Sequence, residues 1–419
     1  MKTILEIGRA AREASYQLAA APTEQKNRAL LNMAEQLEKN YDDIMEANTL
    51  DMANAMAKEK PKAFLDRLML TENRIRAMAK GLRDLVALPD PVGTIDAQWN
   101  GAQDIEITKV RVPLGVIGII YEARPNVTAD GAGICLKTGN AVILRGGSDA
   151  INSNLILGRL LAKGVAEADL PSSSVQVVED TSRDTANKMM TLNRYIDLLI
   201  PRGGKGLIQS VIQNATVPVI ETGAGNCHIF VDETADLKKA ADIILNAKVQ
   251  RPAVCNAVES LLVAEGVAEK ALPVIAEALR KEKVEIRGCA RTVEILRQNE
   301  LPVTPATEED YDTEYSALVI SCKVVKNLEE AIAHINLHGT HHSDCIITEN
   351  EYHAEYFQVA VDSAAVYVNA STRFTDGEQF GFGAEIGIST QKLHARGPMG
   401  LNEMTGYKYL VNGNGQIRK

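Results

Sequence analysis

The apolar residues of the first 88 positions recur at the three- and four-residue spacing of amphipathic helices. Leu30, Ala34 and Leu37 form one such stripe, and a stripe of this kind packs one helix face against a core. Thr23 and Thr71 stand at positions where a side-chain oxygen caps the start of a helix. The pattern therefore predicts a helical N-terminal segment.

A proline- and glycine-rich break at residues 88–93 ends the helical pattern, and polar and apolar residues then alternate over 103–112. Alternation with Ile105 and Ile107 on one face is typical of a half-exposed strand. We expect this strand to belong to an antiparallel arm. The apolar tail at 407–411 is a candidate to pair with that strand or with a second subunit.

From Pro113 onward the chain changes to short, continuous apolar runs separated by helical stretches. Runs of this kind are typical of parallel strands that are buried on both faces. We therefore expect a five-stranded nucleotide-binding sheet. Its strands are predicted at 116–120, 141–144, 175–178, 196–200 and 217–220.

A second α/β pattern begins near His228, and we place the change of domain near Gly225. Helices are expected at 236–249 and 267–282. Strands are expected at 228–231, 259–264, 317–325, 344–348 and 366–368. The predicted organisation is a cofactor-binding domain (1–225), a catalytic domain (226–401) and a β arm made of about 98–112 with 402–419.

Composition narrows the classes of partner. The chain has 419 residues, with 45 Lys and Arg against 55 Asp and Glu, which gives a net charge of −10. Without a long basic run, neither nucleic acid nor an anionic membrane surface is an expected partner. Six cysteines without a CxxC pair, and no apparent secretion signal, favour a reduced, cytoplasmic protein over a disulfide framework.

Neither GxGxxG nor the P-loop pattern occurs, so a different segment must hold any phosphate. The glycine-rich turn at 200–207 follows a predicted strand and opens a predicted helix, where free N–H groups suit a pyrophosphate. A second candidate is the turn at 144–148, in which Arg145 suits a ribose 2′-phosphate. An ordinary glycine turn and a surface arginine are the alternatives.

Cys255 lies in a short segment (QRPAVCNA) between a predicted helix and an apolar strand, with Arg251 nearby. A neighbouring cation favours the thiolate that a cysteine nucleophile needs. The alternative is a buried structural cysteine, which fits Cys135 and Cys345 well because both lie in apolar runs.

Four histidines crowd into one short segment, and two of them are spaced i, i+4. A metal site is therefore considered. No HExxH pattern is present, and a helix ending at Gly339 favours histidines in its last turn through its dipole alone. We predict no metal at these residues, which are His334, His338, His341 and His342.

Six motifs together resemble the gamma-glutamyl phosphate reductase family of the aldehyde dehydrogenase superfamily. The similarity runs from the N-terminal helices to about Tyr409. The motifs are YEARPNVT (121–128), LKTGNAVILRGG (136–147), IPRGG (200–204), QRPAVC (250–255), VYVNASTRFTD (366–376) and TQKLHARGPMG (390–400).

The resemblance implies an aldehyde dehydrogenase-like α/β fold with a Rossmann-type cofactor domain, an α/β catalytic domain and a small β oligomerisation arm. It implies reduction of L-glutamyl 5-phosphate by NADPH to L-glutamate 5-semialdehyde with release of phosphate, the second step of proline synthesis. It also implies a homo-oligomer and a functional link to a separate glutamate 5-kinase. The superfamily binds its dinucleotide without GxGxxG, in agreement with the absence of that motif here.

The resemblance also assigns roles to individual residues. Cys255 matches the nucleophile, Asn126 matches the oxyanion-hole asparagine that acts with the N–H of Cys255, and Glu314 matches the glutamate that holds the nicotinamide ribose. The remaining cofactor-binding residues are Arg145, Gly146, Gly147, Gly203, Gly204 and Gly206. A dianionic, amino-acid-bearing substrate needs forked donors, and the candidates are Arg124, Arg251, Asn369 and Arg373.

Glu221 lies close to the position of a general base in hydrolytic aldehyde dehydrogenases. Such a base would hydrolyse the thioester of a reductase wastefully, so we predict that Glu221 is not one. Two other readings remain open. The first is a hydrolytic NAD(P)-dependent semialdehyde dehydrogenase, and the second is a catalytically silent nucleotide-binding or assembly protein.

Overall fold

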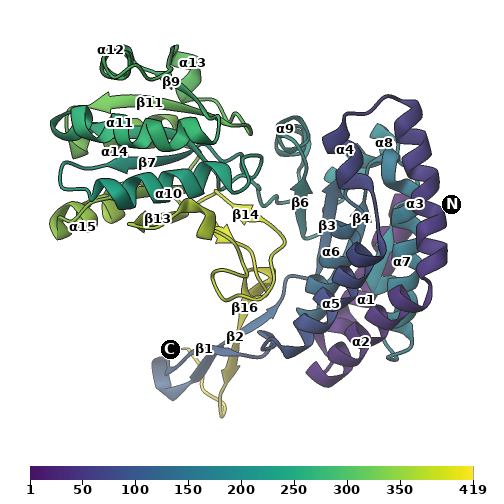
Figure 1. The fold of residues 1–419 in the computed structure, drawn as a ribbon. Coiled ribbons are helices and arrows are strands. Elements are labelled where there is room, and N and C mark those ends of the chain that lie inside the picture. The colour runs from purple at the N-terminus through teal and green to yellow at the C-terminus, as the bar shows by residue number, and fades with distance from the viewer. Residues whose placement is uncertain (419) are drawn as a thin grey trace. The chain divides into compact units, whose positions relative to one another are not determined.

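The computed structural model describes residues 1–418 and divides them into two compact units. Unit 1 comprises residues 1–222, 381–387 and 399–418, and unit 2 comprises residues 223–380 and 388–398. Figure 1 shows the helices and strands of each unit. The first crossing of the chain from one unit to the other falls between Thr222 and Gly223.

Unit 1 begins with the predicted helices, and Thr71 caps one of them by accepting a hydrogen bond from the N–H of Arg74. The predicted cap at Thr23 is wrong. The helix starts at Thr23 itself, because Pro22 is its N-cap, and the Thr23 hydroxyl donates to Asp90. The helices are α1 (Ile4–Ala19), α2 (Thr23–Lys39), α3 (Tyr41–Ala57), α4 (Lys62–Leu68) and α5 (Glu72–Ala87).

A four-stranded parallel sheet forms the centre of unit 1, in the order β5-β4-β3-β6. The fifth strand predicted at 217–220 is wrong, since only Val219 bridges to Leu199. Pro218 has no N–H to donate to a ladder. The strands are β3 (Val116–Tyr121), β4 (Ala141–Arg145), β5 (Val175–Val177) and β6 (Leu198–Arg202); the helices are α6 (Asn126–Lys137), α7 (Ile151–Ala166), α8 (Arg183–Met190) and α9 (Lys205–Asn214).

The β arm of unit 1 consists of β1 (Ile95–Asn100), β2 (Glu106–Pro113) and β16 (Thr405–Asn412), in the order β1-β2-β16. β16 pairs antiparallel with β2 from Thr405↔Pro113 to Asn412↔Glu106. This confirms the expected pairing of the tail within the chain. β2 starts three residues later than predicted, because Gln103 and Asp104 adopt positive φ in the turn before it.

Unit 2 contains a seven-stranded parallel sheet in the order β10-β9-β11-β8-β7-β12-β13, with an apolar core on its faces. All five strands predicted in this region are confirmed. The strands are β7 (Cys227–Val231), β8 (Val258–Ala264), β9 (Glu285–Gly288), β10 (Thr304–Pro305), β11 (Val319–Val325), β12 (Ser343–Ile347) and β13 (Ala365–Val368), with a separate pair of β14 (Ile388–Ser389) and β15 (Gly397–Pro398).

Both helices predicted in unit 2 are confirmed, and the helix expected to end at Gly339 does so. Within residues 1–418, no helix combines the length and the apolar character that a membrane span requires. The helices of unit 2 are α10 (Leu237–Val249), α11 (Glu265–Lys281), α12 (Ala290–Gln298), α13 (Glu308–Tyr311), α14 (Leu328–His338) and α15 (Glu351–Ala360).

Candidate active site

Cys255 lies in the loop that joins α10 to β8, and its side chain is partly exposed. All six cysteines lie within the described residues, and only Cys289 shares this partial exposure. Burial raises the pKa of Cys322 and Cys345 to about 12. It raises the pKa of the Cys135 and Cys227 thiols as well. These four thiols therefore stay protonated and unreactive near neutral pH.

The N-terminal end of β7 fixes the backbone of the nucleophile loop. The buried thiol of Cys227 donates to the carbonyl oxygen of Cys255 at 3.2 Å. Gly225 packs so closely that a Cβ on it would meet the same carbonyl oxygen at 1.4 Å. Only glycine fits at this position, and the close approach holds the Cys255 carbonyl in one orientation.

Two arginines lie near Cys255. The Arg373 guanidinium donates from Nε to Gln250 at 2.9 Å and from Nη1 to Asn256. Burial lowers the pKa of Arg373 first, and repulsion from Arg251 lowers it further, while Cys255 opposes both effects. Asn256 directly follows Cys255, so its bond to Arg373 holds that guanidinium beside the nucleophile loop, and a nearby cation favours the thiolate.

Glu314 lies in the segment between α13 and β11, partly buried. Its carboxylate accepts a hydrogen bond from the N–H of Gly225 at 3.0 Å. Because Gly225 also packs against Cys255, the structure brings Glu314 to the nucleophile loop through this one glycine.

In unit 1, the predicted cofactor residues gather at the carboxyl ends of three adjacent strands. Arg145 of β4 is in register with Ile120 of β3, and Arg202 of β6 is in register with Tyr121. Glu122, the residue after β3, accepts a hydrogen bond from the N–H of Gly204 at 3.2 Å. This edge of a parallel sheet is where α/β proteins bind ligands.

The residues at this edge fit an anionic dinucleotide. The Glu122 carboxylate already occupies the N-terminus of α9, which shows that the backbone there accepts a negative charge. A Cβ on Gly203 would lie 2.8 Å from the Glu122 carboxyl carbon. Arg145 donates through Nη2 to the carbonyls of Thr181 and Ser182, and its buried Nε finds no acceptor among residues 1–418.

Three further residues predicted for the site lie on other elements. Asn126 is the first residue of α6 and donates to Asp130 at 3.0 Å, and Arg124 precedes it in the loop after β3. Asn369 follows β13, and both polar atoms of its amide bond the backbone of Thr348.

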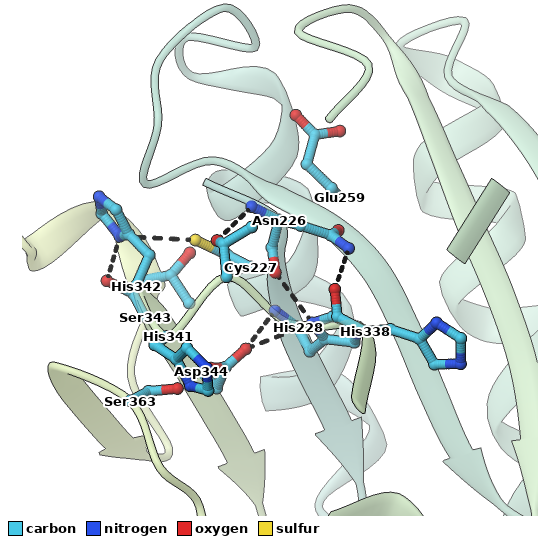
Figure 2. Close-up of polar contacts among 12 residues, drawn as sticks. Asn226, Cys227, His228, Glu259, His338, His341, His342, Ser343, Asp344 and Ser363 are labelled. Carbon is cyan, nitrogen blue, oxygen red and sulfur yellow. Dashed lines mark hydrogen bonds and ion pairs between the residues drawn. The ribbon is translucent and has the colours of Figure 1, made fainter. Parts of the chain in front are cut away.

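The crowded histidines do not converge on one point. The rings of His334 and His338 on α14 meet at a tilted angle with centroids 4.3 Å apart, and His338 pairs with Asp312. His342 contacts Ser343 and Cys227 instead. Figure 2 shows His338 and His342 on opposite sides of β7.

Five polar residues of these sites were not predicted from the sequence. Gln250 and Asn256 hold Arg373, and Glu122 holds Gly204. Lys248 and Glu259 form a buried ion pair at the two ends of the nucleophile loop. Gln250 and Asn256 lie in or beside the QRPAVC motif, but nothing local in the sequence indicates the partners of Glu122, Lys248 or Glu259.

Comparisons with known proteins agree with this arrangement. The sequence model described as Aldehyde dehydrogenase family matches residues 2–293. The gamma-glutamyl phosphate reductase of Clostridium botulinum is 58% identical over 418 residues and covers 100% of both chains. That of Caldanaerobacter subterraneus is 58% identical over 409 residues, or 98% of each chain.

A solved structure extends the comparison to three dimensions. The crystal structure of gamma-glutamyl phosphate reductase from Thermotoga maritima has a TM-score of 0.97 and 51% identity, and the match covers 100% of both chains. The chain belongs to the gamma-glutamyl phosphate reductase family. This confirms the resemblance drawn from the six motifs and the predicted fold class. As a member of this aldehyde dehydrogenase branch, the chain is an oxidoreductase.

Proposed function

We propose that this chain catalyses the NADPH-dependent reduction of L-glutamyl 5-phosphate to L-glutamate 5-semialdehyde with release of phosphate, the second step of L-proline synthesis. The observation that carries the proposal is the nucleophile loop, in which Cys255 is partly exposed, Arg251 lies in the same loop and Arg373 bonds the next residue, Asn256. The family membership supplies the substrate class.

The Cys255 thiolate attacks the carbonyl carbon of the acyl phosphate. A carbon–sulfur bond forms, the bond from that carbon to the phosphate oxygen breaks, and phosphate leaves. NADPH, when bound, supplies the hydride that reduces the thioester carbonyl. Cleavage of the carbon–sulfur bond then releases the semialdehyde and returns Cys255 to its starting state.

Arg251 and Arg373 are proposed to bind the anionic groups of the substrate, with Arg124 as a third candidate. Gln250 and Asn256 support this role because they hold the Arg373 guanidinium from two sides. A fixed planar fork suits a phosphate or carboxylate better than a mobile cation does. Asn369 is not proposed to bind substrate, because both polar atoms of its amide already bond the backbone of Thr348.

For the cofactor, we propose that the N-terminus of α9, with Gly203, Gly204 and Gly206, binds the pyrophosphate. Gly146 and Gly147 border the same sheet edge, since a Cβ on Gly147 would face the Glu122 backbone at 3.7 Å. Arg145 is proposed for the adenosine ribose and Glu314 for the nicotinamide ribose. The oxyanion role of Asn126, with the N–H of Cys255, stays a prediction.

The test is oxidation of NADPH with glutamyl phosphate generated in place by a glutamate kinase, compared with NADH. We expect faster turnover with NADPH and loss of at least about three orders of magnitude in Cys255→Ala. Cys289→Ala is the matched control, because Cys289 is the other partly exposed cysteine. Retained reduction by Cys255→Ala would contradict the mechanism.

The role of Glu221 separates this proposal from a hydrolytic dehydrogenase. A reductase that runs backwards needs phosphate or arsenate to take the acyl group from Cys255, whereas a hydrolytic enzyme uses water. We expect NADP-dependent oxidation of the semialdehyde to require one of these anions. We also expect the Glu221→Gln variant to release as much glutamate as the parent, or more. Rapid oxidation without either anion would favour the hydrolytic enzyme.

Three further properties belong to the proposal. We propose a cytoplasmic homo-oligomer whose β arm supplies contacts between copies. We also propose a functional link to a separate glutamate 5-kinase, because an acyl phosphate hydrolyses readily and benefits from direct use.

A further inference from the structure

A fully buried ion pair joins the two ends of the nucleophile loop. Lys248 lies in the last turn of α10, and Glu259 is the second residue of β8. Their side chains have no exposed area, and Nζ lies 2.6 Å from Oε2. Every residue of the loop that carries Cys255 lies between these two positions, so the pair fixes where the loop leaves the helix and enters the sheet.

The remaining polar atoms of the pair bind a second segment, residues 312–317, which carries Glu314. The other carboxylate oxygen of Glu259 accepts from the N–H of Ser316 at 3.3 Å. Lys248 Nζ donates to the carbonyl of Ala317 at 3.2 Å. Ser316 has a φ of 52°, a left-handed conformation that is uncommon for a serine and costs conformational energy.

Glu314 makes a second link between its segment and the nucleophile loop. Its carboxylate accepts from Gly225, and Gly225 packs against the carbonyl of Cys255. The segment that carries Glu314 is thus tied to the nucleophile loop at two places, by Glu314 itself and by the buried pair, which bonds the residues two and three positions further along.

Stability alone does not account for the pair. Burial raises the pKa of Glu259 to about 7 and lowers the pKa of Lys248, because each charged form loses its hydration in the interior. Well-packed apolar residues of similar volume are often as stable as a buried ion pair or more so. A polar pair is useful here because it fixes the backbone of residues 316 and 317 through directed hydrogen bonds.

We propose that Lys248 and Glu259 are positioning residues that hold segment 312–317 in the one conformation in which Glu314 meets the nicotinamide ribose. The proposal rests on the proposed function for the identity of the dinucleotide and for the role of Glu314 at its nicotinamide ribose. The pair acts through the backbone of Ser316 and Ala317 and touches no reacting atom.

The test replaces both charges at once, with Lys248→Met and Glu259→Leu in the full chain. Amide hydrogen exchange is expected to rise at least about tenfold in peptides covering 312–317, with exchange in α11 unchanged. The dissociation constant for NADPH, measured by fluorescence titration, is expected to rise about three- to tenfold. The KM for NADPH should rise while the KM for glutamyl phosphate stays within about twofold.

Two comparison variants separate positioning from a general structural effect. Lys248→Met with Glu259→Gln keeps an acceptor for the Ser316 N–H, so we expect it to restore the exchange rate and the NADPH affinity to within about threefold of the parent. Lys26 and Asp90 form another buried pair, in unit 1, with side chains 1% and 6% exposed. Lys26→Met with Asp90→Leu should leave exchange in 312–317 unchanged.

Unchanged exchange in 312–317 and unchanged NADPH affinity in the apolar double variant would overturn the proposal. Faster exchange throughout unit 2 would overturn it as well, because it would indicate a general structural role. If the apolar double variant does not fold, Glu259→Gln alone, which weakens the bond to Lys248, is judged by the same exchange criterion. The exchange measurement needs no substrate, so its result is independent of whether the chain reduces glutamyl phosphate.

Discussion

Gly225 brings its backbone against that of Cys255 at a distance that no side chain tolerates. The same residue donates its N–H to Glu314, so one glycine serves both the nucleophile loop and the segment proposed to hold the ribose. Cys227, two residues along, adds a thiol hydrogen bond to the Cys255 carbonyl. The orientation of the nucleophile therefore depends on residues that have no reactive role of their own.

Gly225→Ala tests this dependence. The added Cβ would overlap the Cys255 carbonyl, so the loop must move by more than about an ångström, and we expect kcat to fall by at least about 100-fold. The measurement is steady-state NADPH oxidation together with the rate of Cys255 alkylation by iodoacetamide.

Gly81→Ala is the control for Gly225→Ala. Gly81 lies in α5, and no atom lies within 4 Å of the Cβ that alanine would add. Helix propensity favours alanine there, so activity should be unchanged and stability equal or slightly higher. Full activity in Gly225→Ala would show that the nucleophile loop does not depend on this contact.

At the scale of elements, the loop after β3 places a negative charge at the positive end of the α9 dipole. The Glu122 carboxylate lies at the helix N-terminus, where we propose that the cofactor pyrophosphate binds. Two anions at one helix end repel each other, so Glu122 must give way or weaken binding.

Glu122→Gln keeps a hydrogen-bond acceptor for Gly204 and removes the charge. We expect NADPH to bind about three- to tenfold more tightly, with a difference that shrinks as salt is added. Fluorescence titration at two ionic strengths measures both effects. Glu72→Gln, an exposed glutamate paired with Arg76 on α5, is the control and should change neither. Weaker binding in Glu122→Gln would mean that the carboxylate supports the cofactor site.

The elements also show what the sequence pattern can predict. Alternation and short apolar runs are local signals, and they located the arm, the parallel strands of both units and the pairing of β16 with β2. The run at 217–220 carried the same signal but forms only one bridge, because Pro218 interrupts the ladder.

Contacts between residues far apart in sequence were not predictable in the same way. Glu122 and Gly204 are 82 positions apart, and Glu259 and Ser316 are 57 apart. No single motif contains both residues of either pair, so no motif predicts that the two residues are in contact. Cys255 was identifiable from its motif. The residues that hold its loop in place were not, because they contact the loop only when β7, β8 and β11 lie together in the folded sheet.

At the scale of the whole molecule, buried histidines link stability to pH. Burial lowers the pKa of His334 to about 2 and that of His342 to about 4. An unfolded chain binds these protons near pH 6.5, so it holds more protons than the folded chain at lower pH. The free energy of unfolding must therefore fall as the pH drops below about 6.5.

We expect a loss of about 1 to 2 kcal/mol for each of these two histidines between pH 6.5 and 5, measured by urea denaturation. His342→Asn should flatten the dependence by about its own share. His341→Gln is the comparison variant, because the His341 side chain is 42% exposed and its loss removes no buried imidazole. An unchanged slope in His342→Asn would show that His342 takes up a proton in the folded protein.

The β arm presents apolar side chains that unit 1 leaves exposed. Trp99 is 42% exposed, Tyr409 52% and Val411 59%, and the rings of Trp99 and Tyr409 meet edge to face at 6.0 Å. Both outer strands of the three-stranded sheet are edges within the chain. Exposed, apolar edge strands tend to pair with another chain, which supports the proposed homo-oligomer.

Tyr409→Asp with Val411→Asp places two charges on one face of β16, where alternate residues point the same way. If this face is buried between copies, the double variant should dissociate to the mass of a single chain, because unpaired buried carboxylates are costly. Light scattering after size exclusion measures the mass. Tyr16→Asp, at a tyrosine of α1 that is 69% exposed, should leave the mass unchanged. An assembled Tyr409→Asp, Val411→Asp variant would place the contact between copies away from the arm.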